Sequence, residues 1–207
     1  MKAKMLMAVF FCGILAFTAC KNNNEAKNNE EIEAQRQTEL EMQQQKLESE
    51  ANNIDTKLST IDSLRKLHGL IETAQMDELL RVGKGPFTFF APTNSAISEM
   101  NKATLDTLML PEHREDLANL LQYHLIEEDL SYEELKNEIR DNDGEFELSS
   151  MDELGVITAT LDGDKIVLID EKGNKATIVK PDIKASNGVI HLIDGVLQFK
   201  GEEETAL

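Results

Sequence analysis

The chain has 207 residues, of which 41% are hydrophobic and 29% charged, so it can form a packed core beneath a highly charged surface. Its 39 acidic and 21 basic residues give a formal net charge of −18, which repels the phosphates of nucleic acid. With no Trp and only two Tyr, the chain also has few aromatic surfaces on which bases could stack. Composition therefore excludes nucleic acid as a partner.

Residues 1–19 have the pattern of an export signal. Two lysines precede an apolar run, residues 5–17, which is shorter than the roughly 20 residues that a membrane-spanning helix needs. The sequence Phe17-Thr18-Ala19-Cys20 then resembles the lipobox of bacterial lipoproteins, although that pattern usually has Leu where Phe17 stands. The resemblance implies cleavage after Ala19 and lipid attachment at Cys20. The alternative is an ordinary secretory signal with a cysteine nearby.

Cysteine usage agrees with a lipid anchor. Cys12 lies within the apolar run and would be removed with it, which leaves Cys20 as the single cysteine of the mature chain. No internal disulfide could then form, and no thiol would remain as a nucleophile or metal ligand. Lys21 stands where Asp would retain a lipoprotein in the inner membrane of many Gram-negative cells. We therefore expect a bacterial cell-envelope protein, lipid-anchored in the outer membrane, on its periplasmic face or at the cell surface.

Residues 20–53 are expected to form a lipidated polar linker. Between residues 21 and 53 there are seven Asn, five Gln and eight Glu, but no Gly, Pro or aromatic residue. This composition buries too little apolar surface to offset the entropy cost of packing, so we expect disorder or a single helix. A coiled-coil stalk is the alternative, because apolar residues recur every seven positions at Leu40, Leu47, Ile54 and Ile61. Against it, the positions that would complete the seam are polar: Gln43, Glu50 and Lys57.

Residues 54–140 have mainly helical patterns. The apolar spacing predicts an amphipathic helix from Leu58 to Ile71, with Gly69 as a candidate interruption, and a short helix from Met76 to residue 83. A buried strand is expected at 87–90, ending at Pro92. Four further helices are expected to begin near Thr93 or Asn94, Thr104, Pro111 and Ser131. Ser131 and Glu134 have the spacing of a capping box.

After residue 140 the apolar period changes to two, which is typical of strands. Short strands are expected around 146–148, 156–161, 165–170 and 175–179, and the run 189–193 is apolar on both faces, as in a central strand. Helices followed by a strand meander predict an α+β domain over residues 54–200, with a formal charge of −13. Residues 201–207 form a short acidic tail without a structural signal.

Three sequence boxes resemble one family. Residues 85–94, GPFTFFAPTN, are similar to the first conserved box of fasciclin (FAS1) domains; Tyr123-His124 stands where that family has a Tyr-His pair; and residues 185–194, ASNGVIHLID, are similar to its second box. The resemblance covers roughly residues 57–199 and implies a twisted β-sheet wedge capped by several helices, with a role in adhesion or binding outside the cell. The family motif residues are Pro92, Thr93, Asn94, Tyr123, His124, Asn187, Gly188 and His191.

The resemblance also implies a candidate partner contact. In animal relatives, the Tyr-His region and an Asp-Ile pair ahead of the second box are linked to cell-receptor binding, and Asp182 and Ile183 match that pair. The residues themselves favour a structural interpretation, with Ile183 in the core and Asp182 at a strand end. His124 and His191 likewise lie in apolar surroundings, where a neutral imidazole needs one donor and one acceptor as partners.

Catalytic and metal sites are not indicated. The chain lacks the nucleophile-elbow, phosphate-loop and dinucleotide-binding glycine motifs, and its four His lack the close pairing of zinc sites. Residues 141–144, Asp-Asn-Asp-Gly, fail the EF-hand pattern because carboxylates are missing at its first and twelfth positions, so a turn is expected, with a loose surface Ca²⁺ site as the alternative. Pairs such as Glu127-Glu128 are typical of a solvated face. We expect no enzyme activity and no cofactor.

The sequence therefore predicts a membrane-anchored, extracytoplasmic binding or cell-adhesion module. The membrane contact would be the lipid on Cys20, and the partner a protein or a polysaccharide. Two alternatives are an accessory of envelope polymer hydrolysis and a structural envelope lipoprotein. An open cleft combining carboxylates with His124 or His191 would favour the accessory of polymer hydrolysis. Association of chains through Leu40 and Leu47 would favour the structural lipoprotein.

Overall fold

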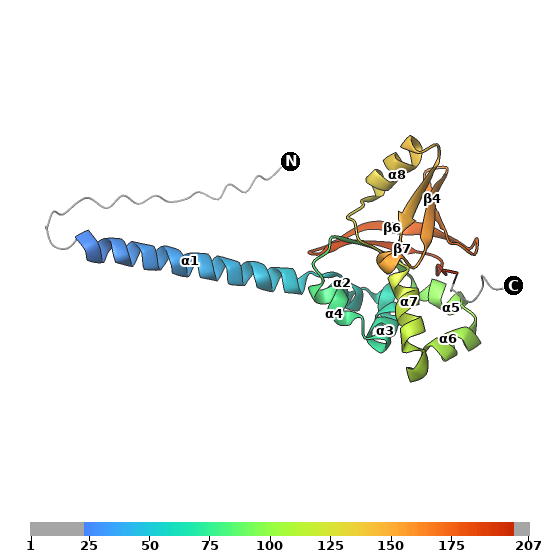
Figure 1. The fold of residues 1–207 in the computed structure, drawn as a ribbon, viewed down its shortest axis with the longest axis horizontal. Helices are drawn as coiled ribbons and strands as arrows, with labels where there is room; N and C mark the ends of the chain where they lie inside the picture. The colour runs from blue at the N-terminus through green and yellow to red at the C-terminus, as the bar shows by residue number, and fades with distance from the viewer. Residues whose placement is uncertain (1–22, 201–207) are drawn as a thin grey trace, which may run out of the picture. The chain divides into compact units, whose positions relative to one another are not determined.

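The computed structural model describes residues 23–200 (Figure 1). By internal contacts the chain divides into two units, with the boundary between Gln43 and Gln44. The linker is helical: α1 (Asn23–Ala51) has exposed side chains from residue 32 onward. Ile54 is fully buried in the domain, and Ile61 packs against the same core, so only Leu40 and Leu47 of the heptad series are exposed on α1. Within residues 23–200, no helix is both long and apolar enough to cross a membrane.

The second unit has a mainly helical first half. Its helices are α2 (Ile54–Thr60), α3 (Arg65–Ala74), α4 (Asp77–Val82), α5 (Asn94–Glu99), α6 (Lys102–Leu108), α7 (Arg114–Gln122) and α8 (Tyr132–Asp141), with 3₁₀ turns η1 (Asp62–Leu64), η2 (Pro111–His113) and η3 (Met151–Glu153).

Two details of these helices differ from the expectation. The helix expected from Leu58 to Ile71 is interrupted at Ile61, whose backbone is extended (φ −94°, ψ 113°), and it continues through Gly69. The break lets both flanking segments turn apolar side chains into one core. The helix expected to begin at Thr104 begins earlier, because Asn101 accepts hydrogen bonds from the N–H groups of residues 103 and 104 and so acts as the N-cap.

Other helix starts agree with the sequence. Thr93 caps α5 by accepting a hydrogen bond from Ala96 N–H, and Pro111 is the first residue of η2. Ser131 and Glu134 form a complete capping box at α8, in which each side chain bonds the other residue's backbone N–H. Local side-chain chemistry therefore determines where these helices begin.

The strands form one seven-stranded sheet. In chain order they are β1 (Phe87–Pro92), β2 (Leu125–Ile126), β3 (Glu145–Ser149), β4 (Val156–Asp162), β5 (Lys165–Ile169), β6 (Lys175–Ala185) and β7 (Gly188–Ile193), and in space their order is β2-β1-β7-β6-β5-β4-β3. Only β1 and β7 pair in parallel; the other neighbours are antiparallel. The expected interior position of β7 is confirmed, whereas β6 extends six residues past the expected end at 179, through two register shifts.

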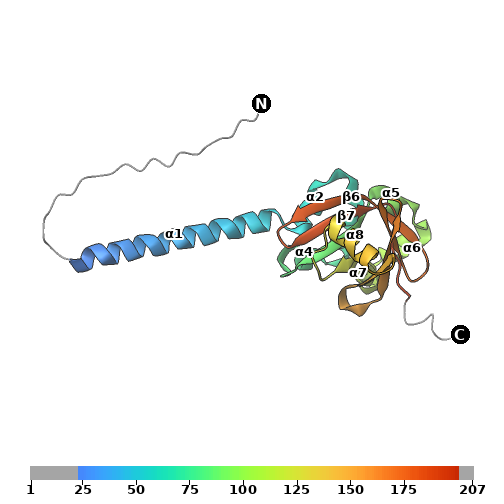
Figure 2. The ribbon, with the colours of Figure 1, turned by 90° about the horizontal axis from the view of Figure 1, so that it is seen from above.

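Two hydrophobic clusters lie on opposite faces of the central strands. Along β1, Phe87 and Phe89 belong to the cluster beneath the helices, whereas Phe90 belongs to the cluster with β3–β6 and α8. This alternation follows from the two-residue period of a strand. Helices α2 to α7 accordingly lie on one side of β6 and β7, and α8 lies on the other (Figures 1 and 2). The α+β class and the wedge with a helical cap are confirmed.

Candidate functional site

The two sequence boxes lie side by side as the central parallel pair. Register runs from Phe87↔Gly188 to Pro92↔Ile193, and it continues one step further because Thr93 N–H donates to Ile193 O at 3.0 Å. Pro92 lies at the end of β1, where its missing N–H costs little. The boxes therefore pair over most of their length.

His124 is a core residue with both ring nitrogens in use. It is 1% exposed; Nδ1 lies 2.8 Å from Leu120 O, and Leu197 N–H donates to Nε2 at 3.0 Å. This pattern requires the neutral tautomer with hydrogen on Nδ1. Burial lowers the pKa of His124 to about 4, with the Leu120 carbonyl and the Asp170 carboxylate opposing that shift.

His191 repeats this arrangement on β7. Nε2 lies 2.8 Å from Leu130 O, and Asp182 N–H donates to Nδ1 at 3.2 Å, so hydrogen sits on Nε2. The side chain is fully buried, and burial lowers its pKa. Each histidine thus has one donor and one acceptor, as expected, and joins backbone segments far apart in the chain.

Asn187 and Gly188 form the turn between β6 and β7. Asn187 Oδ1 accepts from Ile54 N–H at 3.0 Å, and its Nδ2 donates to Leu80 O at 2.8 Å, so one side chain holds α2 and α4 against the turn. Gly188 has a φ of +154°, and a Cβ there would lie 2.0 Å from Phe87 O. Only glycine fits this close approach of β7 to β1.

Tyr123 and Asn94 are also structural. Tyr123 is fully buried, and its hydroxyl donates to Val156 O at 2.7 Å; burial raises the pKa of the phenol. Asn94, following the Thr93 cap, accepts from Lys66 N–H at 2.9 Å and donates to Asp62 O at 2.8 Å, which fastens α3 to α5. Five of the family motif residues therefore connect separate elements through side-chain hydrogen bonds: Asn94, Tyr123, His124, Asn187 and His191.

Of the candidate contact pair, Asp182 does not lie at a strand end as expected, whereas Ile183 does pack against the core. Asp182 lies inside β6, at a register irregularity with a φ of +58°, because the strand runs on to Ala185 instead of ending near Val179. Its side chain is exposed and accepts from Tyr132 N–H at 2.9 Å. Ile183 is half-buried and packs against the helical core.

The other two histidines lie near carboxylates on helices. His68 Nε2 is 3.5 Å from Asp55 Oδ1, and burial raises the pKa of Asp55. His113 Nδ1 is 2.7 Å from Asp116 Oδ2 at the surface. Within residues 23–200, no group of three or more His, Cys, Asp or Glu has the arrangement of a metal site, and the segment 141–144 ends α8 in a turn. Cys20, the lipidation candidate, lies outside the described residues, as does the tail 201–207.

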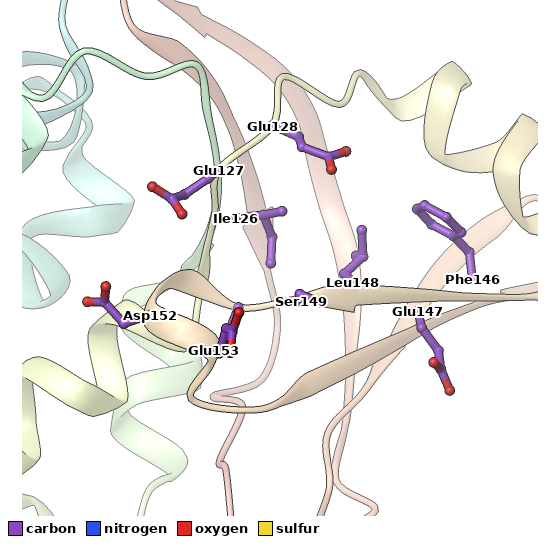
Figure 3. A pocket seen from close by; sticks show the side chains of 10 residues that line it. Ile126, Glu127, Glu128, Phe146, Glu147, Leu148, Ser149, Asp152 and Glu153 are labelled. Carbon is purple, nitrogen blue, oxygen red and sulfur yellow. The ribbon is translucent and has the colours of Figure 1, made fainter.

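Sequence reasoning missed a cleft of about 580 Å³ at the edges of the sheet (Figure 3). It is lined by Ile126, Glu127, Glu128, Phe146, Glu147, Leu148, Ser149, Ser150, Asp152 and Glu153. Five of these ten residues are acidic and none is basic. The sequence gives little sign of this cleft, because Glu127-Glu128 has the pattern of an ordinary solvated pair. Only the folded sheet places that pair near residues 146–153. His124 and His191 are not among the lining residues.

Comparison with known proteins agrees with this geometry. The model of the fasciclin domain matches residues 62–199, so the chain belongs to the fasciclin domain family. Protein sll1483 of Synechocystis sp. is 32% identical over 136 residues, covering 66% of this chain and 67% of its own length. Transforming growth factor-beta-induced protein ig-h3 of Sus scrofa is 35% identical over 115 residues, which are 56% of this chain but 15% of that protein.

A solved structure shows the same fold. The FAS1 domain pair from the insect cell adhesion molecule Fasciclin I superimposes with a TM-score of 0.60 and 19% identity, covering 75% of this chain and 53% of the insect chain. The family and the fold that the three boxes implied are thus confirmed.

Proposed function

We propose that this protein is a lipid-anchored binding module that presents one fasciclin domain outside the cytoplasm. The observation that carries the proposal is the order of the sequence: a lipobox-like segment ending at Cys20, a polar linker, and a single family match at residues 62–199. The insect relative described as a cell adhesion molecule supports a role in adhesion. The partner would be a protein or a polysaccharide of the envelope or its surroundings.

The chemistry of the domain supports binding over catalysis. His124 and His191 are the buried imidazoles of the domain, and each uses both nitrogens in backbone hydrogen bonds. A buried imidazole whose two ring nitrogens are both hydrogen-bonded to the backbone cannot exchange protons with a substrate. An accessory of polymer hydrolysis would need carboxylates and a histidine in one cleft, and the acidic cleft contains neither histidine.

Anchoring would act by raising local concentration. A chain with one acyl group binds membranes only marginally, whereas several acyl chains on one cysteine make detachment negligible. Molecules held in two dimensions combine many weak contacts into stable attachment. A negatively charged domain could not adhere to anionic headgroups by itself, so the covalent lipid is the essential link in the mechanism.

Metabolic labelling with a palmitate analogue tests the anchor. Cells expressing the wild-type chain and Cys12→Ser should show equal label on the protein, because Cys12 lies in the segment that is removed. Cys20→Ser should lose the label and accumulate as an unprocessed precursor that keeps residues 1–19. Equal labelling of Cys20→Ser and wild type would refute the proposed anchor.

A further inference from the structure

The acidic cleft lies between the two open edges of the sheet. In the strand order β2-β1-β7-β6-β5-β4-β3, the edge strands are β2 and β3, and each has one neighbour among the described residues. Residues of both edges line the same cleft: Ile126 ends β2, and residues 146–149 belong to β3. Both edges of the sheet therefore border the same cleft.

Hydrogen-bond alternation shows which backbone groups of β3 are free. Ser150 N–H donates to Gly155 O at 3.0 Å, which makes these two a hydrogen-bonded pair of the β3–β4 ladder. Such pairs alternate along antiparallel strands, so Leu148 also bonds to β4. The N–H and C=O groups of Glu147 and Ser149 therefore point away from β4, toward the open side.

The same reasoning applies to β2. Phe90 N–H donates to His124 O at 3.0 Å, and the next hydrogen-bonded position is Ile126, two residues on. The backbone groups of Leu125 and Glu127 therefore face away from β1. Unpaired edges of this kind are templates for an added strand, and proteins usually block them with lysine, proline or a covering segment.

The lining of the cleft indicates what such a strand would contain. Phe146 and Leu148 project to one side of β3 and Glu147 to the other (Figure 3). Leu148 and Ile126 are each 3% exposed and belong to one hydrophobic cluster, which Phe146 also contacts. Five of the lining residues are acidic, although Glu147 points to the other side of β3. None of the five carboxylates forms an ion pair with another residue between 23 and 200. The volume of about 580 Å³ is within the rough range of 300–1,000 Å³ for ligand clefts.

We propose that this cleft binds an extended segment of a partner protein in which apolar residues alternate with Lys or Arg. The segment adds a strand to the free edge of β3, places its apolar side chains over Ile126 and Leu148, and pairs its cations with Glu127, Glu128 and Glu153. Main-chain hydrogen bonds supply affinity, and the charges supply selectivity. The inference rests on the proposed binding function and names the partner class: a basic peptide segment rather than a polysaccharide.

A synthetic peptide tests the strand addition. The probe is a fluorescein-labelled hexapeptide amide of alternating Lys and Val, titrated with the full-length lipoprotein in nonionic detergent and followed by fluorescence anisotropy. Its Glu-Val counterpart should not bind, and binding of the Lys-Val peptide should weaken as salt rises. The same peptide methylated on alternate backbone nitrogens keeps its charge but cannot pair, so it should lose at least about tenfold in affinity.

Two protein variants, each with its own control, separate the contribution of the charges to binding from that of the backbone hydrogen bonds. Glu127→Gln/Glu128→Gln/Glu153→Gln should weaken the Lys-Val peptide by about tenfold, the combined effect of three exposed ion pairs. The matched control, Glu99→Gln/Glu115→Gln/Glu133→Gln, removes the same charge elsewhere and should bind like wild type. Ser149→Pro removes one outward N–H without touching the β3–β4 ladder and should weaken binding, whereas Ser149→Ala should not.

The outcomes are distinct from those of the anchoring experiment. Three results would each overturn the cleft proposal. The Glu-Val peptide could bind as tightly as the Lys-Val peptide, or the methylated Lys-Val peptide could bind as tightly as the unmethylated one. The third is that the two triple Glu→Gln variants weaken binding by the same factor. Such a result would leave lipid labelling at Cys20 and the display function intact. Conversely, if the wild-type protein takes up no palmitate label but still binds the Lys-Val peptide, the anchoring proposal is refuted and the cleft proposal is supported.

Discussion

At the residue scale, two histidines serve as structural connectors. His124 joins the end of α7, through Leu120 O, to the C-terminal segment, through Leu197 N–H. His191 joins β7 to Leu130 and to the irregular part of β6 at Asp182. An unpaired buried donor or acceptor costs about 1–3 kcal/mol, so each imidazole prevents two such losses. No apolar residue of similar size could replace it.

The connectors make stability depend on pH. The pKa of His124 is about 4 in the folded protein against 6.5 ordinarily, so the unfolded chain binds more protons between these values. The contribution of His124 to the free energy of unfolding is therefore complete above pH 6.5. It declines as pH falls toward 4, by roughly 1.4 kcal/mol per pH unit and about 3 kcal/mol in all. His191 acts in the same direction.

Urea unfolding between pH 7 and 4 measures this dependence. His124→Gln keeps a donor and an acceptor but does not titrate, so its free energy of unfolding should fall less steeply with acid than that of wild type. Gln35→Asn, an exposed substitution in α1 that involves no titrating group, should retain the wild-type slope. Identical slopes for wild type and His124→Gln would show that the buried imidazole is not the titrating group.

At the scale of elements, the parallel pair β1–β7 organises the domain. Its strands are separated by about a hundred residues of chain, yet they run side by side with the helical core on one face and the strand core on the other. The pair requires Gly188 at its start, where the backbone of Phe87 leaves no room for a side chain. Asn187 then ties α2 and α4 to the same point.

Two glycine substitutions should have opposite effects. Gly188→Ala places a Cβ 2.0 Å from Phe87 O and should lower the free energy of unfolding by about 3 kcal/mol or more. Gly69→Ala lies inside α3 with nothing within 4 Å of the new Cβ, so it should raise stability by roughly 0.5–1 kcal/mol. Denaturant titration compares both with wild type, and a neutral Gly188→Ala would contradict the close approach.

At the scale of the molecule, residues 32–51 of the helical linker show little of the continuous apolar surface that a stalk needs. Ile54 and Ile61, which extended the heptad series in the sequence, belong to the domain core instead. The remaining pair, Leu40 and Leu47, spans little more than two turns, and a stable coiled coil needs several heptads. We therefore expect α1 to act as a spacer without joining chains.

Sedimentation equilibrium in a density-matched detergent checks this expectation. The wild-type protein and Leu40→Asn/Leu47→Asn should both sediment as one chain per micelle at low protein-to-detergent ratio. A wild-type dimer that the double substitution dissociates would instead support the structural-stalk alternative. Glu41→Gln, on the same helix, serves as a variant that should change nothing.

The sequence alone determined the features that depend on neighbours along the chain. The Ser131–Glu134 box, a helix start at Thr93 or Asn94, the end of β1 at Pro92 and the two-residue period after 140 each follow from local chemistry, and the three boxes identified the family. The sequence also predicted that each buried histidine needs one hydrogen-bond donor and one acceptor, but it could not predict which residues supply them.

Only the tertiary structure decided what depends on distant segments. The helix break moved to Ile61 because the core needed side chains from both flanks, and β6 ran past Asp182 because β7 lay beside it to pair with. The acidic cleft arose because the curvature of seven strands brought Glu127 and Glu153 to one place. Twist and strand order are properties of the whole sheet, and local propensity does not encode them.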